Sequence, residues 1–239
     1  MHSVVKVKSL YLVVFLTLML NGILQAQVVN RFENAREVNI GNLKIKITPS
    51  LAIGDIRVGK ERVIDGCYLF FQGHWNKKFH HVGLQFWDKG EYKEVKKDNE
   101  RIFSIDISPY ATKKGLYYTY KEKLTILPFE IKIHYEVEIL KDIKELSSDP
   151  NAWVTCAFIV KFNKDILNLQ EKPVVQKGEV IYATKSGKLI SLTYNPNLNI
   201  ARNYIGRGEI RIGKGHSKYI LKKGERIIID VKISLPSAS

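Results

Sequence analysis

The segment from Gly73 to Trp87, GHWNKKFHHVGLQFW, gathers side chains that could contact a saccharide. It holds two of the three tryptophans, three of the six histidines and a pair of lysines. Aromatic rings pack on the apolar faces of ligand rings, while Asn, His and Lys side chains can hydrogen-bond hydroxyl or carboxylate groups. The predicted ligand-binding residues are Trp75, Lys77, Lys78, His80 and Trp87.

Core packing is the alternative role for the aromatic residues of this segment. Phe86 and Trp87 follow Leu84 in a strand-like stretch. Because neighbouring side chains on a strand point to opposite faces, one of the two rings would face the core.

A metal site among the histidines is a weaker interpretation. His80 and His81 are adjacent, so on a strand they could not both bind one ion without a bulge. His74 and His80 would need a distant carboxylate, and zinc sites generally use three or four converging ligands. We predict no metal ion and no other cofactor.

A second candidate site lies in FEIKIHYEVEIL, where His134, Glu136 and Glu138 are spaced by two and share the polar face of a strand. A carboxylate beside an imidazole can orient or charge it, which suits proton transfer. His134 and Glu136 are therefore the alternative site residues. A solvated strand face is the competing interpretation, since Glu130 and Lys132 continue the same alternation.

Other catalytic patterns are absent from the sequence. The glycines at 206, 208, 213 and 215 lack the strand-to-helix context of a phosphate-binding loop, and they indicate tight turns around a short strand, GEIRI. There is no G-x-S-x-G elbow and no cysteine in a polar setting.

Alternation with a period of two dominates the chain and predicts half-buried strands. In FEIKIHYEVEIL the residues from Phe129 to Ile139 at odd positions form the apolar face. The same pattern places Leu43, Ile45 and Ile47 inward in NLKIKIT, and Ile227, Ile229, Val231 and Ile233 inward in ERIIIDVKISL. WVTCAFIV is apolar on both faces, which predicts a strand in the middle of the fold.

Turn signals separate these strands at Ser186-Gly187, Leu127-Pro128 and Lys223-Gly224. Only KDIKELSS near residue 141 and KDILNL near residue 164 suggest a turn or two of helix. The predicted fold is therefore all-β: one large antiparallel two-sheet β-sandwich with very little helix, spanning residues 27–239. Its predicted buried residues include Tyr135, Val137, Val154, Phe158, Val160, Ile229 and Val231.

The order of these segments resembles the galactose mutarotase-like β-supersandwich of carbohydrate-acting proteins. The resemblance rests on KIHYEVEILKD, a short excursion, WVTCAFIVKFNKDI and the closing ILKKGERIIIDVKISLP, and covers about residues 40 to 236 in outline. It implies a concave sheet face that binds sugar, as in epimerases, polysaccharide lyases and accessory domains of glycoside hydrolases. The His and Glu of mutarotases and the Tyr, His and Arg sets of lyases have no matching motifs, so no active site is transferred.

The first 26 residues have the layout of a secretory signal peptide. Lys6 and Lys8 precede an apolar run from Leu10 to Leu20, and Ala26 offers a small residue for cleavage. The run is short for a membrane span, although the charge-free stretch from Ser9 to Asn30 leaves an uncleaved anchor as the alternative. We expect a secreted or periplasmic protein without a stable membrane span after cleavage.

The mature chain is strongly basic, because removing Lys6 and Lys8 lowers the formal net charge only from +14 to +12. Its lysines fall singly or in pairs, without the runs and interleaved aromatics of RNA-binding proteins. We predict no nucleic acid partner. The surface is either simply solvated or suited to an anionic ligand at the cell envelope. The sequence indicates no particular protein partner.

The two cysteines, Cys67 and Cys156, lie in the apolar stretches DGCYLFF and WVTCAFIV. We favour two buried thiols over a disulfide, because nothing in their spacing requires contact.

Two functions follow from these observations. The first is an exported non-catalytic β-sandwich module that binds a neutral or anionic saccharide at the cell envelope. The second is a small carbohydrate-active enzyme of epimerase or polysaccharide lyase type, using His, Glu or Tyr on a concave sheet face. A deep groove with converging ionisable groups would favour the enzyme, whereas a shallow aromatic platform, or no platform at all, would favour the module.

Overall fold

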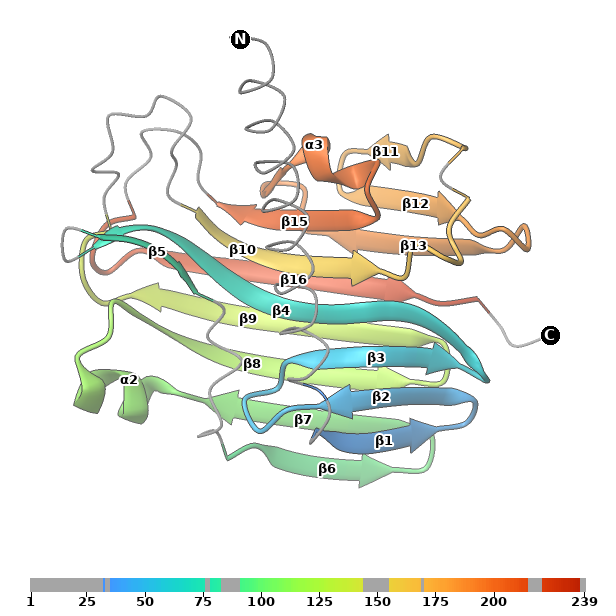
Figure 1. Cartoon of the computed structure of the whole chain (residues 1–239). Helices are drawn as coiled ribbons and strands as arrows, with labels where there is room; N and C mark the ends of the chain where they lie inside the picture. The colour runs from blue at the N-terminus through green and yellow to red at the C-terminus, as the bar shows by residue number, and fades with distance from the viewer. Residues whose placement is uncertain are drawn as a thin grey trace, which may run out of the picture.

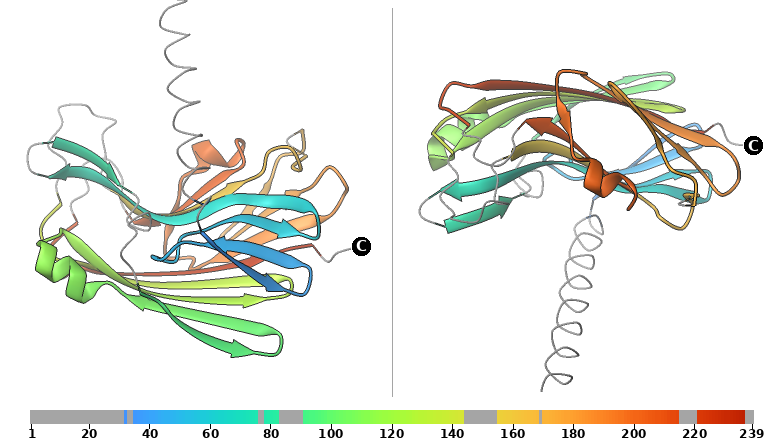
Figure 2. Two further views of the ribbon diagram at one scale, coloured as in Figure 1. Left: turned by 60° about the horizontal axis from the view of Figure 1, so that its bottom comes forward. Right: turned by 90° about the horizontal axis from the view of Figure 1, so that it is seen from above.

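The computed structural model describes residues 32, 35–75, 78–82, 91–143, 155–168, 170–214 and 221–236. For residues 72–75, 78–82, 155 and 203 it describes the backbone alone. Within these ranges the chain forms two eight-stranded antiparallel sheets packed face to face (Figures 1 and 2), which confirms the predicted sandwich. The predicted signal peptide, residues 1–26, lies outside the described residues.

The first sheet, sheet A, contains the N-terminal strands and three strands from the second half of the chain. Its order is β1 (Arg36–Ile40), β2 (Leu43–Ile47), β3 (Ile53–Val58), β4 (Glu61–Trp75), β10 (Thr155–Phe162), β15 (Glu209–Lys214) and β14 (Asn199–Ile200), with β5 (Lys78–Val82) paired to β4.

The second sheet, sheet B, carries the long central strands of the chain. Its order is β11 (Val174–Gln176), β12 (Glu179–Ala183), β13 (Leu189–Tyr194), β16 (Arg226–Ser234), β9 (Glu130–Ile139), β8 (Tyr118–Leu127), β7 (Glu100–Asp106) and β6 (Lys93–Lys97).

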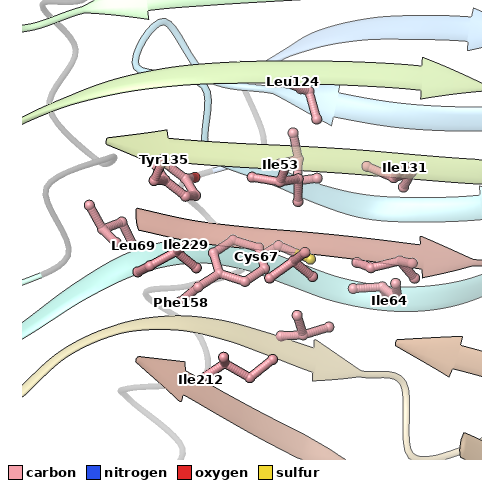
Figure 3. Close-up of a cluster of buried hydrophobic side chains, with 14 of the residues drawn as sticks. Ile53, Ile64, Cys67, Leu69, Leu124, Ile131, Tyr135, Phe158, Ile212 and Ile229 are labelled. Atoms are coloured by element: carbon pink, nitrogen blue, oxygen red, sulfur yellow. The ribbon is translucent and has the colours of Figure 1, made fainter. Parts of the chain in front are cut away.

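The core lies between the sheets, where the apolar faces of the alternating strands meet (Figure 3). Tyr135 of β9 reaches across to Phe158 of β10, with ring centroids 5.7 Å apart. The predicted buried residues Tyr135, Val137, Phe158, Val160, Ile229 and Val231 are all buried, and Val154 lies outside the described residues. The prediction was wrong for Phe129, which is 43% exposed because it belongs to the turn between β8 and β9.

A second apolar cluster covers the outer face of sheet A. Ile159 of β10 packs there with Tyr68 and Phe70 of β4, so the stretch around residue 158 is buried on both sides, as its composition predicted. Phe32, which precedes β1, belongs to the same cluster. Its ring lies over Gly54 and Gly66, two glycines paired directly across β3 and β4. A Cβ atom at Gly54 would lie 2.6 Å from the ring, so only glycine leaves room for Phe32.

Contacts between sheets close both sides of the sandwich. On one side Arg36 of β1 lies 2.8 Å from Glu94 of β6 and donates a hydrogen bond to Tyr92 at 3.2 Å. On the other, the Tyr182 hydroxyl of β12 donates to the carbonyl of Ile205 at 2.8 Å. The first contact ties the edge strands β1 and β6 to each other, and the second ties β12 to α3 (Arg202–Ile205), which follows the edge strand β14.

The turns follow the predicted signals, whereas the helices do not. Gly187 and Gly224 adopt positive φ angles of 76° and 81° in the turns before β13 and β16. The stretch after Lys164 is not helical, because Leu167 bridges to Thr184 and Asn168 donates to the carbonyl of Ala183. The described helices are instead α2 (Ser108–Lys114) and α3 (Arg202–Ile205). Most of the stretch predicted near residue 141 lies outside the described residues.

The two cysteines are free and buried, as favoured from the sequence. They lie on adjacent strands, but Cys67 pairs with Val160 and Cys156 with Phe71. A four-residue offset along a ladder is about 13 Å at the usual rise per residue, far beyond the roughly 7 Å limit between bridged Cα atoms.

Candidate functional site

The candidate site lies on the face of sheet B that is turned away from sheet A. His134 alternates with Tyr135 along β9, and because Tyr135 points into the core, His134 points outward. The sheet register places His134 directly between Lys123 of β8 and Asp230 of β16. The next row contains Thr125, Lys132 and Lys232, with Thr193 of β13 beyond them.

His134 is held between two carboxylates. Its Nδ1 atom lies 2.6 Å from Oδ1 of Asp230, and its Nε2 atom lies 3.4 Å from Oε1 of Glu136. Desolvation is the largest single effect on the pKa of His134 and lowers it, but the hydrogen bonds to Asp230 and Glu136 outweigh it and raise the pKa above its ordinary value. The imidazole therefore stays charged to a higher pH than an isolated histidine.

An open depression of about 390 Å³ surrounds His134 and Asp230. Its outward-facing side chains come from rigid strands of sheet B and from the turn after β13, where Asn195 Oδ1 accepts a hydrogen bond from the Asn197 amide. The inward-facing residues Ile133, Tyr194 and Val231 form its floor. We call this site the outer-face depression, and its outward-facing side chains are Lys123, Thr125, Lys132, His134, Thr193, Asn195, Asp230 and Lys232.

The structure brings the second predicted set, His134 and Glu136, together. It does not place the first predicted set, in the segment from Trp75 to Trp87, beside them. Trp75, Lys78 and His80 belong to the β4–β5 hairpin of sheet A, where Trp75 pairs with Lys78 and Gly73 with His80, and only their backbone is described. Lys77 and Trp87 lie outside the described residues. Since His134 faces away from sheet A, the two predicted sets are separate surfaces.

Sequence reasoning missed most of the residues around His134. Asp230 and Lys232 lie on the polar face of the last strand, and Thr193 and Asn195 at the end of another. The alternation could have identified them as outward-facing. It could not show that β16 pairs with β9 or β13 with β16, which is what assembles the depression.

The described residues contain no cluster of three or more side chains arranged to bind a metal ion. The side chains of His74 and His80, considered above for a metal, are not among those described. None of the described helices is long and apolar enough to cross a membrane.

No protein-family model matches the chain, and no curated protein matches its sequence. Among solved structures, it is similar to a putative aldose 1-epimerase from Escherichia coli K12, with a TM-score of 0.47 and 9% identity over 84% of this chain and 98% of that one. It is also similar to the Slr1438 protein from Synechocystis sp. PCC 6803, with a TM-score of 0.49 and 7% identity over 85% and 96% of the two chains. A galactose mutarotase-like protein from Lactobacillus casei gives a TM-score of 0.42 and 12% identity over 84% and 99%. The likeness to these structures concerns the fold alone.

Proposed function

We propose that this protein is an exported, non-catalytic β-sandwich module that binds a saccharide in the outer-face depression. The observation that carries the proposal is the chemistry of the lining. Hydroxyl groups of Thr125 and Thr193, the amide of Asn195 and several cations surround an open space on rigid strands. These are groups that hydrogen-bond sugar hydroxyls, and strands hold them without further ordering on binding.

The arrangement of His134 favours binding over catalysis. Both of its ring nitrogens face carboxylates, so neither is directed at a substrate atom. The depression is also open to solvent, whereas active sites generally exclude water around the reacting groups.

A carbohydrate-active enzyme of epimerase or lyase type is the second candidate, and one observation favours it. His134 has a raised pKa and stands beside Glu136, so it could act as a general acid near neutral pH. Polarimetry of fresh aldose solutions and ultraviolet detection of unsaturated products would reveal either activity. Loss of such activity in His134→Gln would replace the binding proposal with an enzymatic one.

A glycan array followed by calorimetry tests the binding proposal and its location. Removing one hydrogen bond should weaken affinity about three- to tenfold, so we expect Thr193→Val to reduce binding by that amount. Ser191→Ala is the matched control, because Ser191 lies two residues away on the same strand and outside the depression.

The variant Trp75→Ala tests whether the ligand binds at the β4–β5 hairpin and not in the outer-face depression. If Trp75→Ala abolishes binding while Thr193→Val leaves it intact, the ligand is held by the β4–β5 hairpin and not by the outer-face depression. If wild-type protein binds no glycan on the array, the saccharide proposal fails at both surfaces.

Export is supported by the layout of residues 1–26. Intact-mass measurement of the protein recovered from outside the cytoplasm should give a chain that begins near Gln27. Recovery of the full-length chain would contradict cleavage.

A further inference from the structure

The described lining of the outer-face depression offers a saccharide no Phe, Tyr or Trp ring on which to stack. Of these three residue types, the described lining contains Tyr194 alone, and Tyr194 is 8% exposed because its side chain faces the core. Stacking on Trp or Tyr commonly supplies much of the affinity for apolar ligand faces. A ligand bound here must therefore obtain its affinity from hydrogen bonds and charge.

The charges that line the depression are predominantly positive. Lys132 and Lys232 stand directly opposite each other on β9 and β16, an arrangement in which like charges repel. Glu130 partly compensates both, at 2.8 Å from Lys132 and 3.7 Å from Lys232. One carboxylate thus pairs with two ammonium groups, which leaves a net positive charge on these three side chains.

Lys123 adds a further positive charge on the other side of His134. It is exposed, it pairs across the ladder with His134, and it forms no ion pair within the described part of the chain. Among the described residues that line the depression, Asp230 is the single acidic one, and its carboxylate is engaged by His134 at 2.6 Å. The negative charge of Asp230 is therefore offset by His134, and it does not cancel the positive charge of Lys123.

We infer that the ligand of the outer-face depression is an anionic saccharide, whose carboxylate or sulfate groups contact Lys123 and the Lys132–Lys232 pair. This inference rests on the proposed function and narrows it to a substrate class. Charge-assisted hydrogen bonds from lysine to carboxylate or sulfate are stronger than those between neutral groups, which compensates for the missing stacking surface. The threonine hydroxyls and Asn195 then contact ring hydroxyls.

Nucleic acid fits this surface less well, although it too is anionic. Proteins that bind single strands interleave cations with aromatic side chains that stack on bases, and the described lining offers no outward-facing Phe, Tyr or Trp ring. Binding of nucleic acid with equal affinity is therefore an outcome that would overturn the inference.

The test compares oligosaccharides of one length that differ in their acidic groups. Calorimetry would measure binding of an oligogalacturonate, of its fully methyl-esterified neutral form, and of a sulfated oligosaccharide of the same length, at low and high salt. The inference predicts that the methyl ester binds more weakly than the free acid. It also predicts that this difference shrinks as salt rises, because the screening length falls from about 10 Å at 0.1 M to about 3 Å at 1 M.

Two lysines of β8 provide a matched pair of variants. Lys123→Ala should weaken binding of the charged ligand about two- to fivefold at low salt, the range that exposed ion pairs span, and Lys123→Arg should restore it. Lys121→Ala is the control, because Lys121 lies on the same face two residues away, outside the depression and 3.9 Å from Asp106.

The results distinguish failure of the anionic-ligand inference from failure of the proposed function on which it rests. If the neutral ester binds as tightly as both charged ligands, the protein binds saccharide but is not selective for anions, and only the inference fails. If the acid binds and the sulfated ligand does not, carboxylate is the recognised group, and the reverse result assigns sulfate. If Lys121→Ala weakens binding as much as Lys123→Ala, the effect is general surface charge and the inference fails. If none of these ligands binds although the glycan array shows a bound glycan, only the inference fails, and if the array also shows none, the proposed function fails with it.

Discussion

His134 of β9 and Asp230 of β16 face each other across one rung of sheet B, with Nδ1 and Oδ1 2.6 Å apart, although 96 residues separate them in the chain. This contact depends on the pairing of two strands that the chain brings together from distant segments. It also sets the charge state of the central group in the outer-face depression.

The pKa of His134 should therefore lie above its ordinary value, and Asp230→Asn should lower it. An NMR titration of the imidazole resonances measures both. Glu136→Gln is the control, and we expect a smaller change from it because its oxygen lies 3.4 Å from the ring. A wild-type pKa below 6.5, or no response to Asp230→Asn, would contradict the contact.

The same shift predicts how stability depends on pH. Because the pKa is raised in the folded state, the contribution of His134 is fully present below the unfolded-state value near 6.5 and is lost as pH rises through the folded-state value. The side chains of His134 and Asp230 are partly exposed, at 39% and 56%. Their contact should therefore contribute under about 1 kcal/mol to the free energy of unfolding. Urea unfolding of wild type and Asp230→Asn at pH 6 and pH 9 should show a difference at pH 6 that is smaller at pH 9.

Phe158→Ala should destabilise the fold strongly, because Phe158 is fully buried against Tyr135 in the middle of the sandwich. Replacing a buried Phe with Ala costs about 3 to 5 kcal/mol when the site cannot collapse. The control is Ile228→Ala, whose side chain is 39% exposed on β16. Urea unfolding gives both values, and a loss below about 1 kcal/mol at Phe158 would be an ordinary surface effect.

Gly54→Ala should displace Phe32 from the outer face of sheet A. The added Cβ would meet the ring at 2.6 Å, and overpacking of this kind typically costs about 1 to 3 kcal/mol. In a Phe32→Ala background the same change should cost less, since the obstructing ring is gone, and a double-mutant cycle measures that coupling. Gly206→Ala should be close to neutral, because a Cβ there meets nothing within 4 Å. Equal costs of Gly54→Ala in both backgrounds would show that Phe32 is not seated on this glycine.

Both thiols should be unreactive in the folded protein. Burial raises the pKa of Cys67 and of Cys156 well above the ordinary value, so neither is a thiolate near neutral pH. Alkylation followed by mass spectrometry should add no label to native protein and two labels after denaturation without reductant. A mass lower by two hydrogen atoms, with no label after denaturation, would reveal a disulfide.

The sequence predicts where the strands of this protein lie better than it predicts which strands pair with each other. Alternation along FEIKIHYEVEIL determines that Tyr135 is buried and His134 is exposed, because the side-chain period of a strand is two. It contains no information about which strand lies alongside, so the contact between His134 and Asp230 could not be foreseen. The predicted His134–Glu136 pair was found because both residues belong to one strand.

Short helices were harder to predict for a related reason. The seven residues of α2 are too few to show a helical period, and the informative signals are local ones: Pro109 in the first turn, Lys113 and Lys114 in the last, and Gly115 at a φ of 61° after it. The stretch after Lys164 lacks these signals, and its pairing with the end of β12 takes the place of helical hydrogen bonds.

The position of Phe32 defines a second surface of the sandwich. Its ring is seated on Gly54 and Gly66 on the outer side of sheet A, whereas the outer-face depression opens on the outer side of sheet B. The two broad faces can therefore be covered independently, because a contact at the Phe32 cluster leaves the depression open to a ligand.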